Sequence, residues 1–212
     1  MVYLKQLWVK FRYSHFLRLF FDALARLGIR VSPYYLFQEI ISPANPPDPS
    51  GFENYDVDFW GLKEMKQMAL IPGRKFSEEF LAQRLTDGHK CLGLKKNNNL
   101  VAFTWCNFKE ATFKYHHFPL KAEEAYLFDA YTLVAYRGRG IAPFLRYHLY
   151  EELKNLGHTK LYSYSDYFNK PAIRFKHKLN AKKEKLFLTI ELFSKWRFHF
   201  VFKDYQKQTK SA

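Results

Sequence analysis

Two arginines alternate with two glycines directly before an apolar stretch, in YRGRGIAPFL from Tyr136 to Leu145. Apolar residues recur at helical spacing after the second glycine, which predicts that a helix begins there. A helix start has unpaired N–H groups and roughly half a positive charge. Gly138 and Gly140 lack the Cβ atoms that would keep a ligand from the backbone, and Arg137 and Arg139 add charge. The stretch is predicted to bind an anion such as phosphate; a solvated basic turn is the alternative.

An acidic residue, Asp129, precedes this stretch in a run of β-forming residues from Ala125 to Val134, which predicts a strand. A carboxylate buried among Tyr, Leu and Phe side chains has a raised pKa, which suits either a general base or an amine-binding group. The alternative is that Asp129 pairs with one of the chain's many cations. Both interpretations remain open at this point.

Cysteine and histidine indicate neither a metal site nor a disulfide. Cys91 and Cys106 are the only cysteines and form no CxxC pair; both lie in apolar, strand-like stretches, where buried free thiols are expected. His116 and His117 are adjacent, so in a strand they would point to opposite faces. We expect them in a polar loop.

The composition describes a folded and strongly basic chain of 212 residues. Apolar residues make up 48%, aromatic residues 19%, and the formal net charge is +14. This charge favours anionic partners: nucleic acid, anionic lipid or a phosphorylated cofactor. The chain has no apolar run of about 18 residues, so no membrane-spanning helix is predicted. The first residues lack the features of a secretion signal. The expected location is cytoplasmic, with membrane association as an option.

The first 30 residues predict a basic amphipathic helical segment. It contains six lysine or arginine residues and only one acidic residue, Asp22. Gly28 is the expected end of the helix, and Ser32-Pro33 is an expected break. Such a segment could pack on the domain, mediate dimerisation or lie on an anionic membrane surface.

The remaining chain predicts strands and helices in a mixed order. The expected elements are a strand at Tyr34 to Ile41, a Pro-rich linker at Ser42 to Gly51, helices at Asp58 to Leu70 and Ser77 to Gly88, a hairpin around Asn97 to Asn99, the strand before the glycines, a helix at Gly140 to Leu156, a strand at Lys160 to Tyr164, a short helix with Pro171 and two closing strands. This order predicts an α/β (α+β) sheet protein. We expect a helical extension at 1–33, one domain at 34–205 and a tail at 206–212.

The arginine–glycine stretch resembles the GCN5-related N-acetyltransferase (GNAT) superfamily. Arg137 to Ala142 fits the family signature Arg/Gln-x-x-Gly-x-Gly/Ala. The flanking strand and helix, and the pattern N-x-x-A-x-x-F-x-x-x-L from Asn169 to Leu179, resemble the rest of the family's cofactor-binding half. The resemblance covers about Tyr34 to Lys203 and is strongest from Glu124 to Asn180. It implies a mostly antiparallel sheet flanked by helices, with a central pair of splayed strands.

The resemblance implies a binding site for acetyl-CoA. The residues that it places at the cofactor are Tyr131, Thr132, Leu133, Val134, Arg137, Gly138, Arg139, Gly140, Ile141, Ala142 and Asn169. The strand backbone would pair with pantetheine, and an amide near Leu133 would polarise the thioester carbonyl. The loop from Arg137 to Ala142 would hold the pyrophosphate, and Asn169 would bond the pantetheine arm.

The resemblance also implies catalytic candidates. EAYLFDAYT is similar to the corresponding stretch of ribosomal-protein alanine N-acetyltransferases, in which the first Glu acts through water as the base. That position is Glu124, and Asp129 competes with it. The usual acid, a Tyr on the helix after the Asn, is replaced by Lys176. The groups that could protonate the leaving thiolate instead are Tyr167, Tyr164 and His177; alternatively, the thiolate leaves without an acid, stabilised by the helix end.

The expected function is therefore transfer of an acetyl or other acyl group from acetyl-CoA to a primary amine, by direct attack in a ternary complex. A CoA-binding regulator or a membrane-surface acyltransferase of the same fold is the alternative, because the usual Tyr acid is missing. A basic nucleic-acid-binding protein is a third interpretation, opposed by the apolar stripe of the helix after the glycines. The aromatic and basic segments on the expected acceptor side favour an anionic or amphiphilic acceptor.

Overall fold

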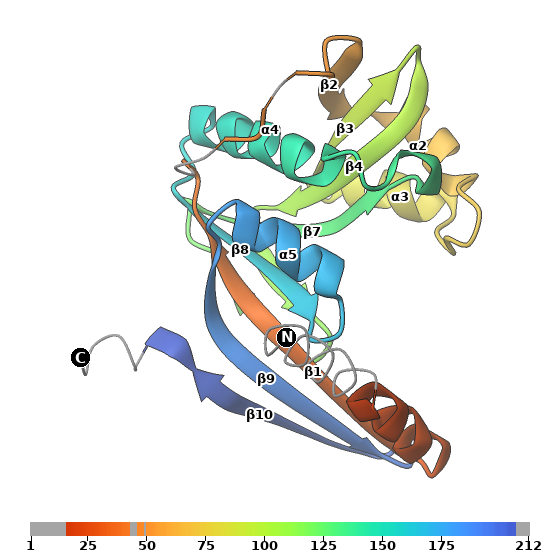
Figure 1. The fold of residues 1–212 in the computed structure, drawn as a ribbon, viewed down its shortest axis with the longest axis vertical. Coiled ribbons are helices and arrows are strands. Elements are labelled where there is room, and N and C mark those ends of the chain that lie inside the picture. The colour runs from red at the N-terminus through yellow and green to blue at the C-terminus, as the bar shows by residue number, and fades with distance from the viewer. Residues whose placement is uncertain (1–15, 43–45, 49, 207–212) are drawn as a thin grey trace, which may run out of the picture. The chain divides into compact units, whose positions relative to one another are not determined.

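The computed structural model describes residues 16–42, 46–48 and 50–206 (Figure 1). The chain divides into two compact units. The first unit comprises Met1–Leu36, Ser165–Ile173 and Lys183–Ala212, and the second comprises Phe37–Tyr164 and Arg174–Lys182.

The second unit contains five strands in the hydrogen-bonded order β8-β7-β4-β3-β2. Their bounds are Lys160–Asp166 (β8), Glu124–Thr132 (β7), Asn99–Asn107 (β4), Lys90–Lys96 (β3) and Tyr55–Trp60 (β2). The pairs β2–β3, β3–β4 and β4–β7 are antiparallel, and only β7–β8 is parallel among these pairs. This confirms the predicted mostly antiparallel sheet.

The β3–β4 hairpin turns at the predicted asparagines. Asn97 and Asn98 have φ of 49° and 63°, a left-handed conformation that Asn tolerates better than most residues. The turn chemistry therefore identified this hairpin correctly from local sequence.

Strand β2 was not predicted, because the expected helix was placed from Asp58 onward. The sequence YDVDFW alternates acidic and apolar residues, a period of two that suits a strand with one buried face. Each residue of β2 pairs with β3, from Tyr55 opposite Lys96 to Trp60 opposite Cys91. The helix begins only after Gly61, at Leu62.

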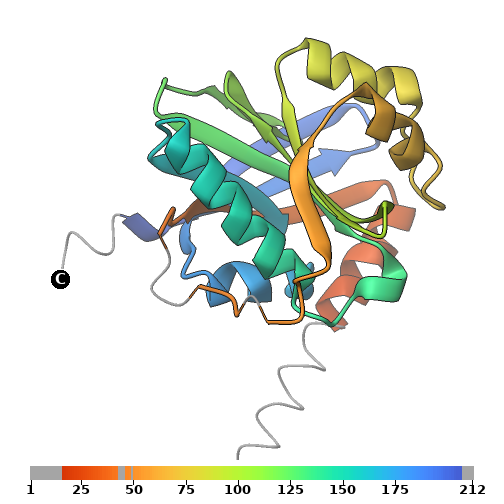
Figure 2. The same ribbon diagram turned by 90° about the horizontal axis from the view of Figure 1, so that it is seen from above.

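Helices cover both faces of these strands. Helices α2 (Leu62–Ala69) and α3 (Glu78–Thr86) pack on one face, and α4 (Ile141–Asn155) packs on the other (Figure 2). Successive β4 residues alternate between the two cores: Ala102 packs with the α4 side, and Phe103 packs with the α2–α3 side. As predicted, Ser77 caps α3, since its side chain accepts a hydrogen bond from the Phe80 amide.

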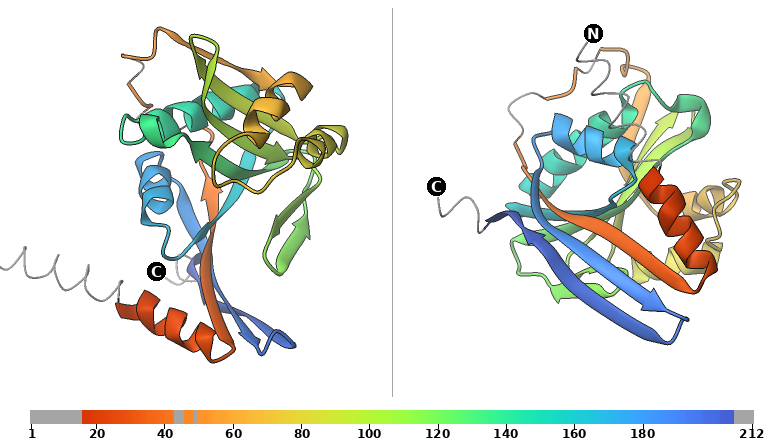
Figure 3. Two further views of the ribbon diagram at one scale, coloured as in Figure 1. Left: turned by 90° about the vertical axis from the view of Figure 1, so that its right-hand side faces the viewer. Right: turned by 60° about the horizontal axis from the view of Figure 1, so that its bottom comes forward.

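A separate two-stranded sheet follows β4 in the chain. It consists of β5 (Glu110–Phe113) and β6 (His116–Pro119), drawn as a green hairpin in Figure 3. The expectation of a polar loop for His116 and His117 was therefore wrong. The two rings start the second strand of the hairpin, where Phe113 pairs with His116.

The first unit contains the strands β10-β9-β1 in hydrogen-bonded order. Their bounds are Trp196–Asp204 (β10), Lys182–Leu192 (β9) and Ile29–Glu39 (β1), the last of which continues into the second unit. Residues 16–26 form helix α1, and Gly28 follows it with φ 84°, as expected. The rest of the predicted N-terminal helix lies outside the described residues.

The helix does not continue through Ser32-Pro33, as predicted, but the expected strand start at Tyr34 was wrong. These two residues lie within β1, which begins at Ile29 rather than at Tyr34. The Pro33 carbonyl still takes part in pairing, because it accepts a hydrogen bond from the Tyr167 amide. Helix α5 (Lys170–Lys178) runs from the first unit into the second. Among the described helices, none is long and apolar enough to span a membrane.

Candidate functional site

The parallel strands β7 and β8 are paired over only part of their length. Pairing runs from Glu124 opposite Lys160 to Leu127 opposite Ser163, whereas β7 continues to Thr132 and β8 to Asp166. The strands therefore separate after Ser163, with the divergence visible in Figure 1. The backbone of the second half of β7 is left with one edge that does not pair with β8.

A bulge accompanies this separation. On β4, Thr104 alone occupies the space between the pairs Phe103–Tyr131 and Trp105–Phe128, while β7 places two residues there. The first of these, Asp129, has φ 46°, as the extra residue of a bulge often requires. The bulge bends β7 close to the point where its pairing with β8 ends.

The hydrogen bonds between β4 and β7 determine which β7 amides face away from β4. Leu133 donates its N–H to the Val101 carbonyl at 2.9 Å, so the Leu133 amide is engaged with β4. In an antiparallel ladder, alternate residues direct N–H and C=O to opposite sides. Thr132 therefore presents its backbone away from β4, and Arg137 Nε donates to its carbonyl at 3.1 Å. The Thr132 amide, next to the predicted Leu133, therefore lies on the edge of β7 that faces away from β4.

The loop after β7 is built around two left-handed glycines. Gly138 has φ 80° and Gly140, the N-cap of α4, has φ 77°. A Cβ at Gly138 would meet no atom within 4 Å, and one at Gly140 would meet only the edge of Phe52 at 4.0 Å. The glycines are thus required by backbone conformation and leave open space in front of the loop.

The N–H groups of this loop are available to a ligand. Within the described part of the chain, none of the amides of Gly138, Arg139, Gly140, Ile141 and Ala142 donates a backbone hydrogen bond. The first helical bond of α4 is from the Phe144 amide to the Gly140 carbonyl, and Pro143 has no N–H. A row of unpaired amides at a helix N-terminus is suited to phosphate oxygens.

A hollow of about 370 Å³ adjoins the loop. Its lining includes Arg139, Gly140 and Lys178, with Asp48 as an acidic member. The guanidinium of Arg139 lies 5.7 Å from the Tyr136 ring centre. Arg137 differs from Arg139, because its Nε holds the end of β7. The two predicted cations therefore have different roles: Arg137 bonds the end of β7 next to the loop, and Arg139 lines the hollow.

Glu124 lies at the end of β7 that pairs with β8, opposite Lys160. Lys160 Nζ is 3.3 Å from its carboxylate, the Tyr162 hydroxyl donates to it at 3.2 Å, and the Lys121 amide donates at 3.1 Å. Burial raises the pKa of Glu124, but these donors together lower it below the ordinary value. Eight residues of extended strand, roughly 26 Å, separate it from Thr132. This geometry favours a structural ion pair for Glu124 over the predicted base.

Asp129 is held between two arginines. Arg74 Nη2 lies 2.6 and 2.8 Å from its two carboxylate oxygens, and Arg84 Nη1 lies 2.8 Å from one of them. Both guanidinium groups also stack on aromatic rings, for example Arg74 on Tyr131 and Arg84 on Trp105. Of the two interpretations of Asp129, the ion pair is the one that this geometry supports.

The remaining predicted residues, Tyr167 and Asn169, belong to the first unit. The Tyr167 ring stacks on Tyr35 with 5.5 Å between ring centres. The Asn169 side chain accepts a hydrogen bond from the Ala172 amide at 3.2 Å, which caps the start of α5. The roles of both residues toward the cofactor and the thiolate stay predictions.

Lys176, at the position of the family's usual Tyr, is buried in a charged cluster. Glu39 accepts hydrogen bonds from the Tyr150 and Ser163 hydroxyls and lies 3.6 Å from Arg146 Nε and 3.8 Å from Lys176 Nζ. Lys176 also donates to the Tyr164 carbonyl at 2.9 Å. Burial, with Arg146 adding to it, lowers the pKa of Lys176 to about 7, although Glu39 opposes this.

Tyr164 lies immediately after Ser163, the last residue of β8 that pairs with β7. Its hydroxyl is 2.5 Å from His116 Nδ1, and its ring lies 5.7 Å from that of Tyr126. The phenol therefore stands where β7 and β8 separate, with a hydrogen-bonded imidazole beside it.

Comparison with known proteins agrees with this geometry. The sequence model of the acetyltransferase (GNAT) family matches residues 59–180, more than half of the 212-residue chain. The chain belongs to the GNAT acetyltransferase family. No curated protein matches the chain.

Solved structures, among them GNAT acetyltransferases, share the fold. A putative GNAT acetyltransferase from Novosphingobium aromaticivorans is 23% identical, with a TM-score of 0.51 over 78% of this chain and 66% of that chain. A GNAT acetyltransferase from Colwellia psychrerythraea is 17% identical, with a TM-score of 0.56 over 77% of this chain and 57% of that chain. A Drosophila protein is 15% identical, with a TM-score of 0.56 over 82% and 56%. The chain thus spans between 56% and 66% of the lengths of these three proteins.

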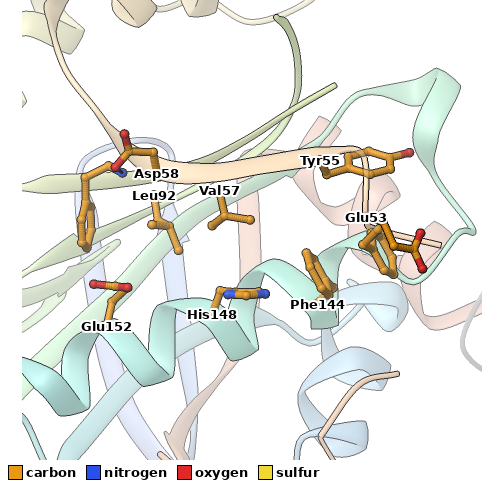
Figure 4. A pocket seen from close by; sticks show the side chains of 10 residues that line it. Glu53, Tyr55, Val57, Asp58, Leu92, Phe144, His148 and Glu152 are labelled. Carbon is orange, nitrogen blue, oxygen red and sulfur yellow. Dashed lines mark hydrogen bonds between the residues drawn. The ribbon is translucent and has the colours of Figure 1, made fainter. Parts of the chain in front are cut away.

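A second hollow of this GNAT protein, about 460 Å³ in volume, lies between β2 and α4 (Figure 4). Three carboxylates line it, those of Glu53, Asp58 and Glu152, together with His148. Burial lowers the pKa of His148, although Glu152 and Glu151 oppose this, so it supplies little compensating charge at neutral pH. Repulsion between these carboxylates and phosphate makes this hollow unsuited to a CoA pyrophosphate.

The buried cluster around Glu39 was not predicted. Glu39 follows an apolar strand pattern, and Arg146 adjoins the apolar stripe of α4. A charged residue next to a buried stripe is the one signal that could have indicated these residues. The hydrogen bond between Tyr164 and His116 could not be foreseen, because it depends on the fold of the β5–β6 hairpin.

Proposed function

We propose that this GNAT protein transfers an acyl group from a CoA thioester to a primary amine. The observation that carries the proposal is the start of α4, where two left-handed glycines expose a row of amides that have no partner among the described residues. Enzymes of this family generally use acetyl-CoA. The loop amides suit the pyrophosphate of that molecule.

The β7 edge supplies the second part of the proposal. The backbone of Thr132 lies on the edge of β7 that faces away from β4, at the end of β7 that does not pair with β8. Its N–H would polarise the thioester carbonyl and stabilise the negative charge that develops on the oxygen. The extended pantetheine arm would pair with this edge as an additional strand.

Proton transfer is assigned to Tyr164 and His116. The neutral amine attacks the thioester carbon, the carbon–sulfur bond breaks, and one proton moves from nitrogen to sulfur. Tyr164 gives its proton to the thiolate, and His116 passes the amine proton back to Tyr164 across their 2.5 Å contact. Tyr164 takes the place of the Tyr that the family usually carries where this chain has Lys176.

The test is release of CoA thiol from acetyl-CoA, measured over a panel of primary amines. With the amine of the panel that reacts fastest, Tyr164→Phe is expected to lower kcat by about 10²-fold, while KM for acetyl-CoA changes little. Tyr162→Phe is the matched control, because Tyr162 lies on the same face of β8 and contacts Glu124 instead. Equal kcat values for the Tyr164→Phe variant and the wild type would overturn the proton assignment.

A further inference from the structure

A small cavity of about 50 Å³ lies beside the β7 bulge, on the α4 face of the sheet. Its apolar or backbone lining is provided by Phe103, Ala130, Tyr131, Thr132, Ala142, Leu145 and Phe175. The cavity therefore adjoins the segment of β7 proposed to hold the thioester. Its volume suits only a group of a few heavy atoms.

Two polar side chains, Thr104 and Arg146, complete the lining. They are 2% and 3% exposed. Thr104 Oγ1, and Nε and Nη1 of Arg146, have no hydrogen-bond partner within the part of the chain that the structure describes. Buried polar groups in folded proteins are nearly always paired. A hydroxyl and a guanidinium that share one cavity thus indicate a ligand that brings acceptor oxygens.

The surrounding charges indicate that this ligand is anionic. Arg146 and Lys176 are the cations of the buried cluster, and Glu39 is its one acid. Because the pKa of Lys176 is about 7, about half of the molecules at neutral pH carry a protonated Lys176, and in these the cluster has one positive charge in excess. A buried excess charge is strongly unfavourable, and a carboxylate beside Arg146 would neutralise it.

We propose that the cavity receives a terminal carboxylate on the acyl group, so that the preferred donor is the CoA thioester of a short dicarboxylic acid. This inference rests on the proposed function. The methyl of an acetyl group would leave Thr104 Oγ1, and Nε and Nη1 of Arg146, without a hydrogen bond. A carboxylate accepts hydrogen bonds from a hydroxyl and a guanidinium together, and the cavity volume limits the acid to a few carbons.

Calorimetric binding of two thioesters of equal size tests the proposal. Malonyl-CoA carries a carboxylate where acetoacetyl-CoA carries a methyl ketone. Wild-type protein is expected to bind malonyl-CoA at least tenfold more tightly than acetoacetyl-CoA, about the contribution of one hydrogen bond to a charged group. Thr104→Val is expected to lower this ratio severalfold, and Arg146→Met to remove it.

Thr189→Val is the matched control, because Thr189 is equally buried, at 2% exposure, and bonds His199 in the first unit. It should leave the ratio unchanged. Equal affinities of the wild type for the two thioesters would overturn the proposal, as would an undiminished ratio in Thr104→Val, which keeps the test valid if Arg146→Met does not fold. Absence of binding by CoA and every thioester would instead contradict the proposed function.

Discussion

At the scale of residues, this protein concentrates its unusual chemistry in buried charged groups. Glu39 keeps its charge because Arg146, Lys176 and two hydroxyls surround it, and these groups lower its pKa despite the opposing effect of burial. Asp129 is similarly enclosed by Arg74 and Arg84. Such clusters tolerate poorly the removal of one member, because the remaining charges lose their compensation.

Lys176 makes the stability of the fold depend on pH. Its pKa is about 7 in the folded protein, against 10.5 ordinarily. Between these values the unfolded chain binds a proton that the folded protein does not, so Lys176 makes the free energy of unfolding increase with pH. Below pH 7 Lys176 is protonated in both states, so the full cost of burying its charge lowers the free energy of unfolding.

We therefore expect Lys176→Met to change stability in a pH-dependent way. Relative to this variant, the wild type should gain up to about 1.4 kcal/mol of unfolding free energy per pH unit between pH 7 and 9.5. Urea denaturation at several pH values measures the difference. Lys178→Met is the control, since Lys178 is exposed on the same helix. A difference that is constant with pH would show that the pKa of Lys176 is not lowered.

At the scale of elements, local sequence predicted what local physics determines. The Asn97–Asn98 turn, the Ser77 cap and the glycine-capped start of α4 each depend on a few consecutive residues. Strand β2 was missed and Pro33 was taken for a break, because pairing with neighbouring strands decides both. The Glu39 cluster joins four segments that are distant in the sequence, β1, α4, β8 and α5, so no local pattern could have indicated its contacts.

The cap of α3 gives a prediction at this scale. Ser77→Ala removes the acceptor for the Phe80 amide and is expected to lower the free energy of unfolding by about 1 kcal/mol. Ser77→Asp should retain most of the stability, because its carboxylate can accept the same bond and interacts favourably with the helix N-terminus. Urea denaturation compares the three proteins. Equal stability of Ser77→Ala and the wild type would show that the cap contributes nothing.

At the scale of the whole molecule, the chain combines a GNAT fold with a net charge of +14. The positive charge favours the approach of a CoA thioester, which carries several phosphate charges. The second unit contains the loop, the β7 edge, Tyr164 and the small cavity. The central claim of the account is that the loop at the start of α4 binds the pyrophosphate of this thioester.

The most direct test of that claim is calorimetric titration of acetyl-CoA into the wild type, Gly140→Asp and Gly157→Asp. The two glycines flank α4, with φ of 77° and 86°, and neither would place a Cβ in a clash. The backbone strain of the two substitutions is therefore matched, but only an Asp at 140 puts a negative charge against the phosphates. We predict that Gly140→Asp abolishes binding and that Gly157→Asp retains it. Equal affinities of the two variants, or no binding by the wild type, would contradict the account.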